Sequence, residues 1–304
     1  MGRSTSRRAT SERTPDATNL ESSRVDGTAV NDRRGVVDAA QGRIGSLTVL
    51  VPTRNESGNI APLLERLGEI ARTMPLAVLF VDDSIDDTPQ VIRRLATRST
   101  FPVDVLHRPE GERTRGLGGA VWAGLKATRT ELVCVMDADL QHPPELLPAL
   151  VAEGRRSKVD VVVASRHRAG GDLSAFSARR RALSRAAALV ANALFPFRLR
   201  GLSDPMSGFF LVRSAAIDVT SLRPNGFKIL LEILLAGPRL SISEVGFRFG
   251  QRHAGDSKAT LREGGRYLRR LIALRICRWK PAGKHRITVA TPMPMRSLDA
   301  DATR

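Results

Sequence analysis

The sequence predicts an α/β fold, a mostly parallel sheet with helices on both faces. Short apolar runs rich in β-branched residues alternate with longer stretches whose apolar residues recur at helical spacing. The short runs are continuously apolar, which is typical of parallel strands buried on both faces. Polar residues follow several of these runs, at the carboxyl ends of strands where such sheets bind ligands. With 304 residues, the chain can bury a core of normal size.

The elements can be placed in order along the chain. Strands are predicted at 47–52, 77–83, 103–108, 131–137 and 159–166. Helices are predicted at about 59–73, 86–98, 116–128 and 144–156. Residues 1–46 and 281–304 are polar and lack apolar periodicity, so we expect two disordered tails around one domain at 47–280.

The chain is strongly basic, with a formal net charge of +17 from 48 Lys+Arg and 31 Asp+Glu. Such an excess favours anionic partners such as nucleic acid, anionic lipid or phosphorylated ligands. The arginines are scattered along the whole chain, so an arginine-rich genome would explain the excess equally well. A nucleic-acid-binding protein is the alternative from another class. A single tyrosine and the lack of a basic-aromatic motif argue against it, and we expect no nucleic-acid partner.

Cysteine content and hydropathy bear on the compartment. Cys134 and Cys277 form no CxxC pair, which favours a reducing compartment. The sequence has no uninterrupted run of about 18 apolar residues, so no transmembrane helix is expected. Residues 267–279 have the pattern of a basic amphipathic helix, which could lie on a membrane surface or pack against the domain.

The segment VMDADLQHPPE at 135–145 predicts a metal site. Asp137, Asp139 and Gln141 are two residues apart, and in an extended chain they would point the same way. Their oxygens suit Mg²⁺ or Mn²⁺, and an ion with few protein ligands completes its shell with phosphate oxygens and water. A nucleotide diphosphate would fit that role. His142 could join the metal or only cap the loop.

Two earlier strand ends are also polar. VPTRNE closes the first strand, and VDDSIDD closes the second. Asp86 or Asp87 can cap the helix that follows. Asp82 and Asp83 stand at the strand end instead, where a carboxylate can accept hydrogen bonds from ribose hydroxyls or base N–H groups.

These three segments, in this order and spacing, resemble the family 2 glycosyltransferases of the GT-A fold. The closer resemblance is to dolichol-phosphate mannose synthases and their bacterial polyprenol-phosphate counterparts. Later segments of that subgroup are matched by RGLGGAVWAGL (115–125), SRHRAGG (165–171), SDPMSGF (203–209), GFKILLEILL (226–235) and RHAGDSK (252–258). The resemblance covers about residues 47–275. It implies an inverting transfer of a hexose, mannose from GDP-mannose, to a polyprenyl or dolichyl monophosphate, with Mg²⁺ or Mn²⁺.

The resemblance also implies roles for single residues. The base and ribose pocket would be lined by Pro52, Arg54, Glu56, Val81 and Asp83. The metal and the diphosphate would be held by Asp137, Ala138, Asp139 and Gln141. Phosphate oxygens would be bound by Arg166, Lys228, Arg252 and Lys258. The acceptor phosphate would be faced by Ser184 and by one of Arg179–Arg181, which we assign to Arg180. Catalysis is expected to depend most on Asp139, Arg166 and Arg252.

The acceptor of this subgroup is already an anionic nucleophile, so it needs cationic groups rather than a general base. Arg54, SIDD (84–87) and SDPMSGF depart from the common residues, which leaves open another donor such as UDP-glucose or a non-lipid acceptor. A catalytically silent relative that binds a membrane protein is a third reading. Many relatives carry membrane helices after this region, whereas this sequence has no apolar run long enough for one. We therefore expect a cytoplasmic protein, peripheral on the inner face of the cell membrane or held there by a membrane-anchoring partner.

Overall fold

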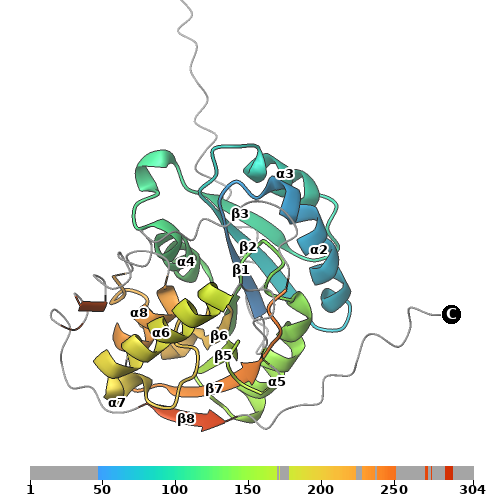
Figure 1. Cartoon of the computed structure of the whole chain (residues 1–304). Helices are drawn as coiled ribbons and strands as arrows, with labels where there is room; N and C mark the ends of the chain where they lie inside the picture. Colours follow the sequence, from blue (N-terminus) through green and yellow to red (C-terminus); the bar gives the residue numbers. More distant parts are fainter. Residues whose placement is uncertain are drawn as a thin grey trace, which may run out of the picture. The chain divides into compact units, whose positions relative to one another are not determined.

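A computed structural model describes residues 47–169, 171, 178–223, 228–236, 238–250, 271–272, 275 and 285–289. These residues form an eight-stranded mixed sheet with helices on both faces (Figure 1). The mostly parallel α/β sheet that the sequence predicts is confirmed. The predicted N-terminal tail at 1–46 lies outside the described residues.

The strands are β1 (Leu47–Thr53), β2 (Leu76–Asp82), β3 (Val103–His107), β4 (Leu132–Val135), β5 (Val161–Ser165), β6 (Phe210–Arg213), β7 (Ser241–Gly246) and β8 (Arg286–Val289). Their order in the sheet is β3-β2-β1-β4-β6-β5-β7-β8. The helices are α2 (Ser57–Ala71), α3 (Thr88–Ala96), α4 (Gly116–Ala127), α5 (Leu147–Arg156), α6 (Ala178–Leu194), α7 (Pro196–Leu199) and α8 (Ile229–Ala236). Short 3-10 turns are η1 (Glu110–Glu112), η2 (Pro144–Leu146) and η3 (Ser214–Ala216).

The centre of the sheet is built from continuously apolar strands. All residues of β1 and β2 are buried, as are those of β4. β1 pairs parallel with both β2 and β4, and Thr53 lies opposite Asp82 at the carboxyl end of the β1–β2 pair. Because these strands are parallel, the polar residues that follow each of them meet at one edge of the sheet.

Two layers of helices cover the sheet. Residues of α2, α3 and α5 share one apolar cluster with one side of β1, and residues of α4, α6, α7 and α8 share the other (Figure 1). Gly124 lets α4 approach the sheet closely, because a Cβ at this position would lie 2.1 Å from Cδ1 of Leu50. The helices thus pack closely on both faces of the central strands.

Strand β6 was not predicted from the sequence. It has four residues and runs antiparallel between β4 and β5. Because β6 runs against its neighbours, its amino end lies at the same edge as the carboxyl ends of β4 and β5. The segment 203–209, which leads into β6, is therefore brought to the same place as the loops that follow those strands.

Strand β8 corrects the predicted boundary of the domain. Residues 286–289 belong to the stretch 281–304 that the sequence assigned to a disordered tail, but they pair in parallel with β7. The expectation of a tail is wrong for these residues, because backbone pairing with an existing sheet edge does not require a long apolar run. Of the predicted amphipathic helix at 267–279, only Leu271, Ile272 and Arg275 are described. Among the described helices, none combines the length and the hydropathy needed to cross a bilayer.

His285 fastens the start of β8 and predicts a pH effect. Its Nδ1 accepts the Leu240 N–H at 2.8 Å, and its Nε2 lies 2.8 Å from the Leu234 carbonyl oxygen. Burial lowers the pKa of His285, and the positive charge of Arg198 acts in the same direction. Below about pH 6.5 the unfolded chain therefore binds more protons than the folded chain, so stability falls as the pH falls.

We expect the amide hydrogens of β8 to exchange faster at pH 5.5 than at pH 7, after correction for the intrinsic rate of exchange. Hydrogen exchange followed by mass spectrometry would measure this. The variant His285→Asn keeps an acceptor for the Leu240 N–H but does not titrate, and it should remove the pH dependence. Equal protection at both pH values in the wild-type chain would contradict the prediction.

Candidate active site

The loops at the carboxyl edge of the sheet are hydrogen-bonded to one another. The Ala164 N–H donates to the Phe209 carbonyl at 3.0 Å, which joins the end of β5 to the segment before β6. The Phe247 N–H donates to the Ser165 carbonyl at 3.1 Å, and the Gly250 N–H donates to the Gln141 carbonyl at 2.9 Å. Residues distant in sequence are thus brought together at this edge of the sheet.

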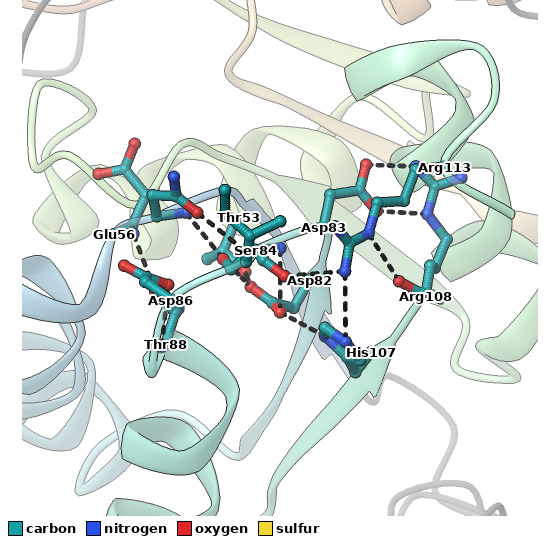
Figure 2. Close-up of polar contacts among 12 residues, drawn as sticks. Thr53, Glu56, Asp82, Asp83, Ser84, Asp86, Thr88, His107, Arg108 and Arg113 are labelled. Carbon is teal, nitrogen blue, oxygen red and sulfur yellow. Dashed lines mark hydrogen bonds and ion pairs between the residues drawn. The ribbon is translucent and has the colours of Figure 1, made fainter. Parts of the chain in front are cut away.

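Asp83 forms a buried ion pair with Arg108 (Figure 2). Arg108 donates from Nε to Oδ1 at 2.7 Å, and its NH2 group donates to Oδ2. The same guanidinium donates to the carbonyl oxygens of Glu112 at 3.3 Å and Gly116 at 3.4 Å. Each carboxylate oxygen has a second acceptor direction, so Asp83 can still receive a ribose hydroxyl or a base N–H.

Asp82 is fully buried and accepts hydrogen bonds within the protein. Its donors are Oγ1 of Thr53 at 2.8 Å, the hydroxyl and N–H of Ser84, and Nδ1 of His107 at 2.7 Å (Figure 2). Arg113 donates to the Ser84 carbonyl at 2.8 Å and lies 3.5 Å from Nε2 of His107. Asp82 therefore joins the ends of β1, β2 and β3, and its side chain is fully buried, whereas that of Asp83 is 10% exposed.

The sequence analysis missed the residues that contact this acidic pair. His107 and Arg108 come directly at the end of β3, and the only available signal was a histidine followed by an arginine at a strand end. Their partners are 25 residues away in the sequence, so the pairing is visible only in the folded chain.

The remaining predicted pocket residues lie at the ends of β1 and β2. Pro52 and Val81 are buried in the strands, Arg54 is exposed, and Glu56 is half-buried. Glu56 accepts a hydrogen bond from Nδ2 of Asn59 at 2.6 Å. The N–H of Glu56 donates to Oγ1 of Thr88 at 3.0 Å, which ties the start of α2 to the start of α3 (Figure 2).

The segment after β4 turns instead of staying extended. Ala138 and Asp139 lie in a turn, Leu140 has a φ of 63°, and the Gln141 N–H donates to Oδ1 of Asp139 at 3.1 Å. The expectation that strand alternation aligns the three polar side chains is therefore wrong. Asp139 and Gln141 are buried, whereas the side chain of Asp137 is 40 % exposed. The turn sets their positions.

His142 caps this turn, which is one of the two roles left open above. Its Nδ1 accepts the Asp137 N–H at 3.0 Å, and its ring stacks on Phe209 with centroids 5.2 Å apart. Burial lowers the pKa of His142 to about 4, with further lowering by the positive charge of Arg166. The ring is thus neutral at physiological pH, and it holds the backbone of Asp137 in place.

The oxygen ligands at this turn suit a hard divalent cation. Among the described residues, no cluster of three or more His, Cys, Asp or Glu side chains could hold a metal ion. The turn offers the carboxylates of Asp137 and Asp139 and the amide of Gln141, which are ligands that Mg²⁺ and Mn²⁺ accept. A cation with so few protein ligands would depend on ligand phosphates and water for the rest of its shell.

Arg166 is held in a fork by Asp204. Its Nε and NH2 groups donate to the two carboxylate oxygens at 2.7 and 2.8 Å, and its backbone N–H donates to Oδ2 at 3.2 Å. Burial alone would raise the pKa of Asp204, but the hydrogen bonds and charge of Arg166 outweigh it and lower the pKa. Burial would lower the pKa of Arg166, but Asp204 and the charge of Asp137 raise it. Both groups are therefore charged, and one edge of the guanidinium is committed to Asp204.

The other predicted cationic and acceptor residues are placed unequally. Lys228 donates to the Met206 carbonyl at 3.3 Å, so it lies beside the segment before β6. Ser184 lies half-buried on α6, and Arg180 belongs to the same helix. Arg252 and Lys258 lie outside the described residues.

The comparison with known proteins decides the family. The family model described as "Glycosyl transferase family 2" matches residues 48–220. The chain belongs to this family. The predicted resemblance is confirmed, and the chain is a glycosyltransferase.

Similar relatives of this family 2 glycosyltransferase are named dolichol-phosphate mannosyltransferase. The protein of Saccharomyces cerevisiae is 34% identical over 75% of this chain and 86% of its own length, and that of Mycosarcoma maydis is 32% identical over 75% and 79%. The protein of Pyrococcus furiosus is 35% identical over 77% of this chain. The chain spans only 64% of that archaeal relative's length.

Solved structures show the same fold. Glucosyl-3-phosphoglycerate synthase from Mycobacterium tuberculosis matches with a TM-score of 0.55 and 23% identity, covering 80% of this chain and 82% of the other. The GT-A fold expected for this family 2 glycosyltransferase is therefore confirmed.

Proposed function

We propose that this family 2 glycosyltransferase moves a mannosyl residue from GDP-mannose to a polyprenyl monophosphate. The observation that carries the proposal is the identity of 32–35% to three relatives that are all named dolichol-phosphate mannosyltransferase. The convergence of the acidic turn after β4 with the Arg166–Asp204 pair supports it, because the reaction brings two phosphate-bearing substrates together.

The donor would lie along the ends of β1, β2 and β4. We assign the base and ribose to Pro52, Arg54, Glu56, Val81 and Asp83. We assign the diphosphate and a divalent cation, Mg²⁺ or Mn²⁺, to Asp137, Ala138, Asp139 and Gln141. Glucosyl-3-phosphoglycerate synthase, which shares the fold, has been crystallised with Mn²⁺. When bound, such a cation neutralises negative charge on the departing diphosphate.

The acceptor phosphate would meet cationic groups rather than a general base. A phosphate monoester is already anionic at neutral pH, so the barrier to be lowered is repulsion between two anions. Arg166 has the fixed orientation that this task needs, since Asp204 locks its fork. We add Lys228, Arg252 and Lys258 for phosphate oxygens, and Arg180 with Ser184 for the acceptor. Direct displacement at the anomeric carbon would invert its configuration.

The chemistry of the acceptor places the reaction at a membrane. A polyprenyl chain stays in the bilayer, so the site must reach the phosphate at its surface. We propose that the chain acts on the cytoplasmic face of the cell membrane, either as a peripheral protein or beside a membrane-anchoring partner. The net charge of +17 suits an anionic lipid surface.

Purified full-length chain, incubated with polyprenyl phosphate and a panel of radiolabelled nucleotide sugars, would test the proposal. We expect label in the extracted lipid from GDP-mannose only, and loss of that label with EDTA. Label from UDP-glucose instead would show that the donor is wrong. Label on 3-phosphoglycerate with none in the lipid would show that the acceptor is wrong. No transfer to any acceptor by the folded chain would refute the proposal.

A further inference from the structure

A buried carboxylate on β7 has no role in the assignments above. The side chain of Glu244 is fully buried, and it accepts hydrogen bonds from three residues. Ser203 donates its N–H at 3.0 Å and its hydroxyl at 2.7 Å, Asp204 donates its N–H at 3.2 Å, and Nε of Arg168 donates at 2.8 Å. Burying a charge is costly unless it is paired and hydrogen-bonded, so this set of bonds marks a specific structural task.

Glu244 is connected to Arg166 by two short routes. Along the first, Glu244 holds the backbone of Asp204, and the carboxylate of Asp204 forks the Arg166 guanidinium. Along the second, Glu244 holds Ser203, whose hydroxyl lies 2.6 Å from the hydroxyl of Ser165, the residue before Arg166. Both routes fix the segment before β6 relative to the end of β5.

We propose that Glu244 is a positioning residue for Arg166, acting through Ser203 and Asp204. The inference rests on the proposed function in one respect, namely that Arg166 meets a phosphate of the substrates. Glu244 touches neither substrate; it sets where the guanidinium points. Arg168 pairs with Glu244 as Arg166 pairs with Asp204, so these two arginines and two carboxylates have no net charge together.

The chemistry of the contacts predicts what a substitution does. Every hydrogen bond at Glu244 comes from an N–H or O–H donor, so the site needs an acceptor on both oxygens. In Glu244→Gln the shape is kept, but one oxygen becomes an NH2 group that meets donors. The Ser203–Asp204 turn then shifts, and the fork on Arg166 shifts with it.

The chain offers a matched control in Glu153. This carboxylate on α5 is also buried, and it accepts hydrogen bonds from Ser157 at 2.7 Å, Ser243 at 2.7 Å and Arg156 at 2.6 Å. Ser243 directly precedes Glu244 on β7, but these three partners of Glu153 include none of the residues that hold the Arg166 fork. Glu153→Gln therefore reproduces the loss of a buried carboxylate that is hydrogen-bonded to strand β7, without removing a hydrogen bond of that fork.

Two measurements on the full chain test the proposal. The first is the 15Nε–1Hε NMR signal of Arg166, assigned by its disappearance in Arg166→Lys. We expect Glu244→Gln to shift or broaden this signal and Glu153→Gln to leave it in place. The second is mannosyl transfer from GDP-mannose to polyprenyl phosphate. We expect Glu244→Gln to lower kcat about 10- to 100-fold with a smaller change in donor KM, and Glu153→Gln to stay within about twofold of wild type.

The two arms separate the inference from the proposed function. If wild-type chain transfers no mannose, the proposed function fails, yet the NMR arm still tests the positioning role. If Glu244→Gln leaves the Arg166 signal unchanged, or Glu153→Gln shifts it equally, the positioning role is refuted. Should Glu244→Gln fail to fold, Ser203→Ala removes only one hydroxyl from the same route and should shift the same signal by a smaller amount.

Discussion

Replacing Asp139 with alanine is expected to lower kcat/KM for mannosyl transfer at least about 100-fold. Asp139 is buried in the turn after β4, beside the partly exposed Asp137. A negative charge in this position attracts a divalent cation and, through it, the donor diphosphate. The initial rate of labelled lipid formation, measured at saturating Mg²⁺, would show the loss.

The carboxylate of Asp139 also holds the turn, so the effect of charge must be separated from that of shape. Asp139→Asn keeps an oxygen for the Gln141 N–H but removes the charge, and we expect it to be nearly as inactive as the alanine variant. Asp218 makes the same local contact after the carboxyl end of β6, at the opposite edge of the sheet, where its Oδ1 accepts the Thr220 N–H at 3.0 Å. Asp218→Ala should therefore keep wild-type activity. An active Asp139→Asn variant would show that the charge is not needed.

Removing the carboxylate of Asp83 is expected to have the largest effect on stability. The side chain of Arg108 is only 7% exposed, and without Asp83 its charge is buried and uncompensated. Breaking a buried pair in this way costs about 3–5 kcal/mol of unfolding free energy. In a domain of this size the melting temperature of Asp83→Ala should fall by roughly 10 °C, as measured by circular dichroism.

Two controls test this explanation. The double variant Asp83→Ala/Arg108→Met leaves no unpaired charge, so it should recover part of the lost stability. The Arg72–Glu69 pair is a surface counterpart, with side chains that are 74% and 63% exposed. Glu69→Ala should change the melting temperature by less than about 2 °C. A melting temperature for Asp83→Ala as close to wild type as that would show that Arg108 finds water or another partner.

The sequence by itself determined the central fold. The strands β1, β2 and β4 and the helices α2 and α4 form within a few residues of their predicted ranges, because their apolar patterns are local and long enough to be distinctive. It also determined the family, since the family model matches residues 48–220, which include the polar segments at the ends of β1, β2 and β4.

Only the tertiary structure showed β6 and β8. Each has four residues, and each exists because a neighbouring strand offers backbone hydrogen-bond partners. The path of residues 137–141 was decided in the same way. The alternating polar pattern allowed an extended chain, but the His142 ring packs against Phe209 and holds the Asp137 N–H, which favours a turn.

Tertiary structure also decided which charges of the site are paired. The sequence places acids and arginines at the strand ends, but it does not show which acid pairs with which arginine. The partners Asp83 and Arg108 are 25 residues apart, Arg166 and Asp204 are 38 apart, and Ser203 and Glu244 are 41 apart. The physical reason is that a buried charge is stabilised by whichever opposite charge the packed strands bring within hydrogen-bonding distance, and that packing depends on the whole sheet.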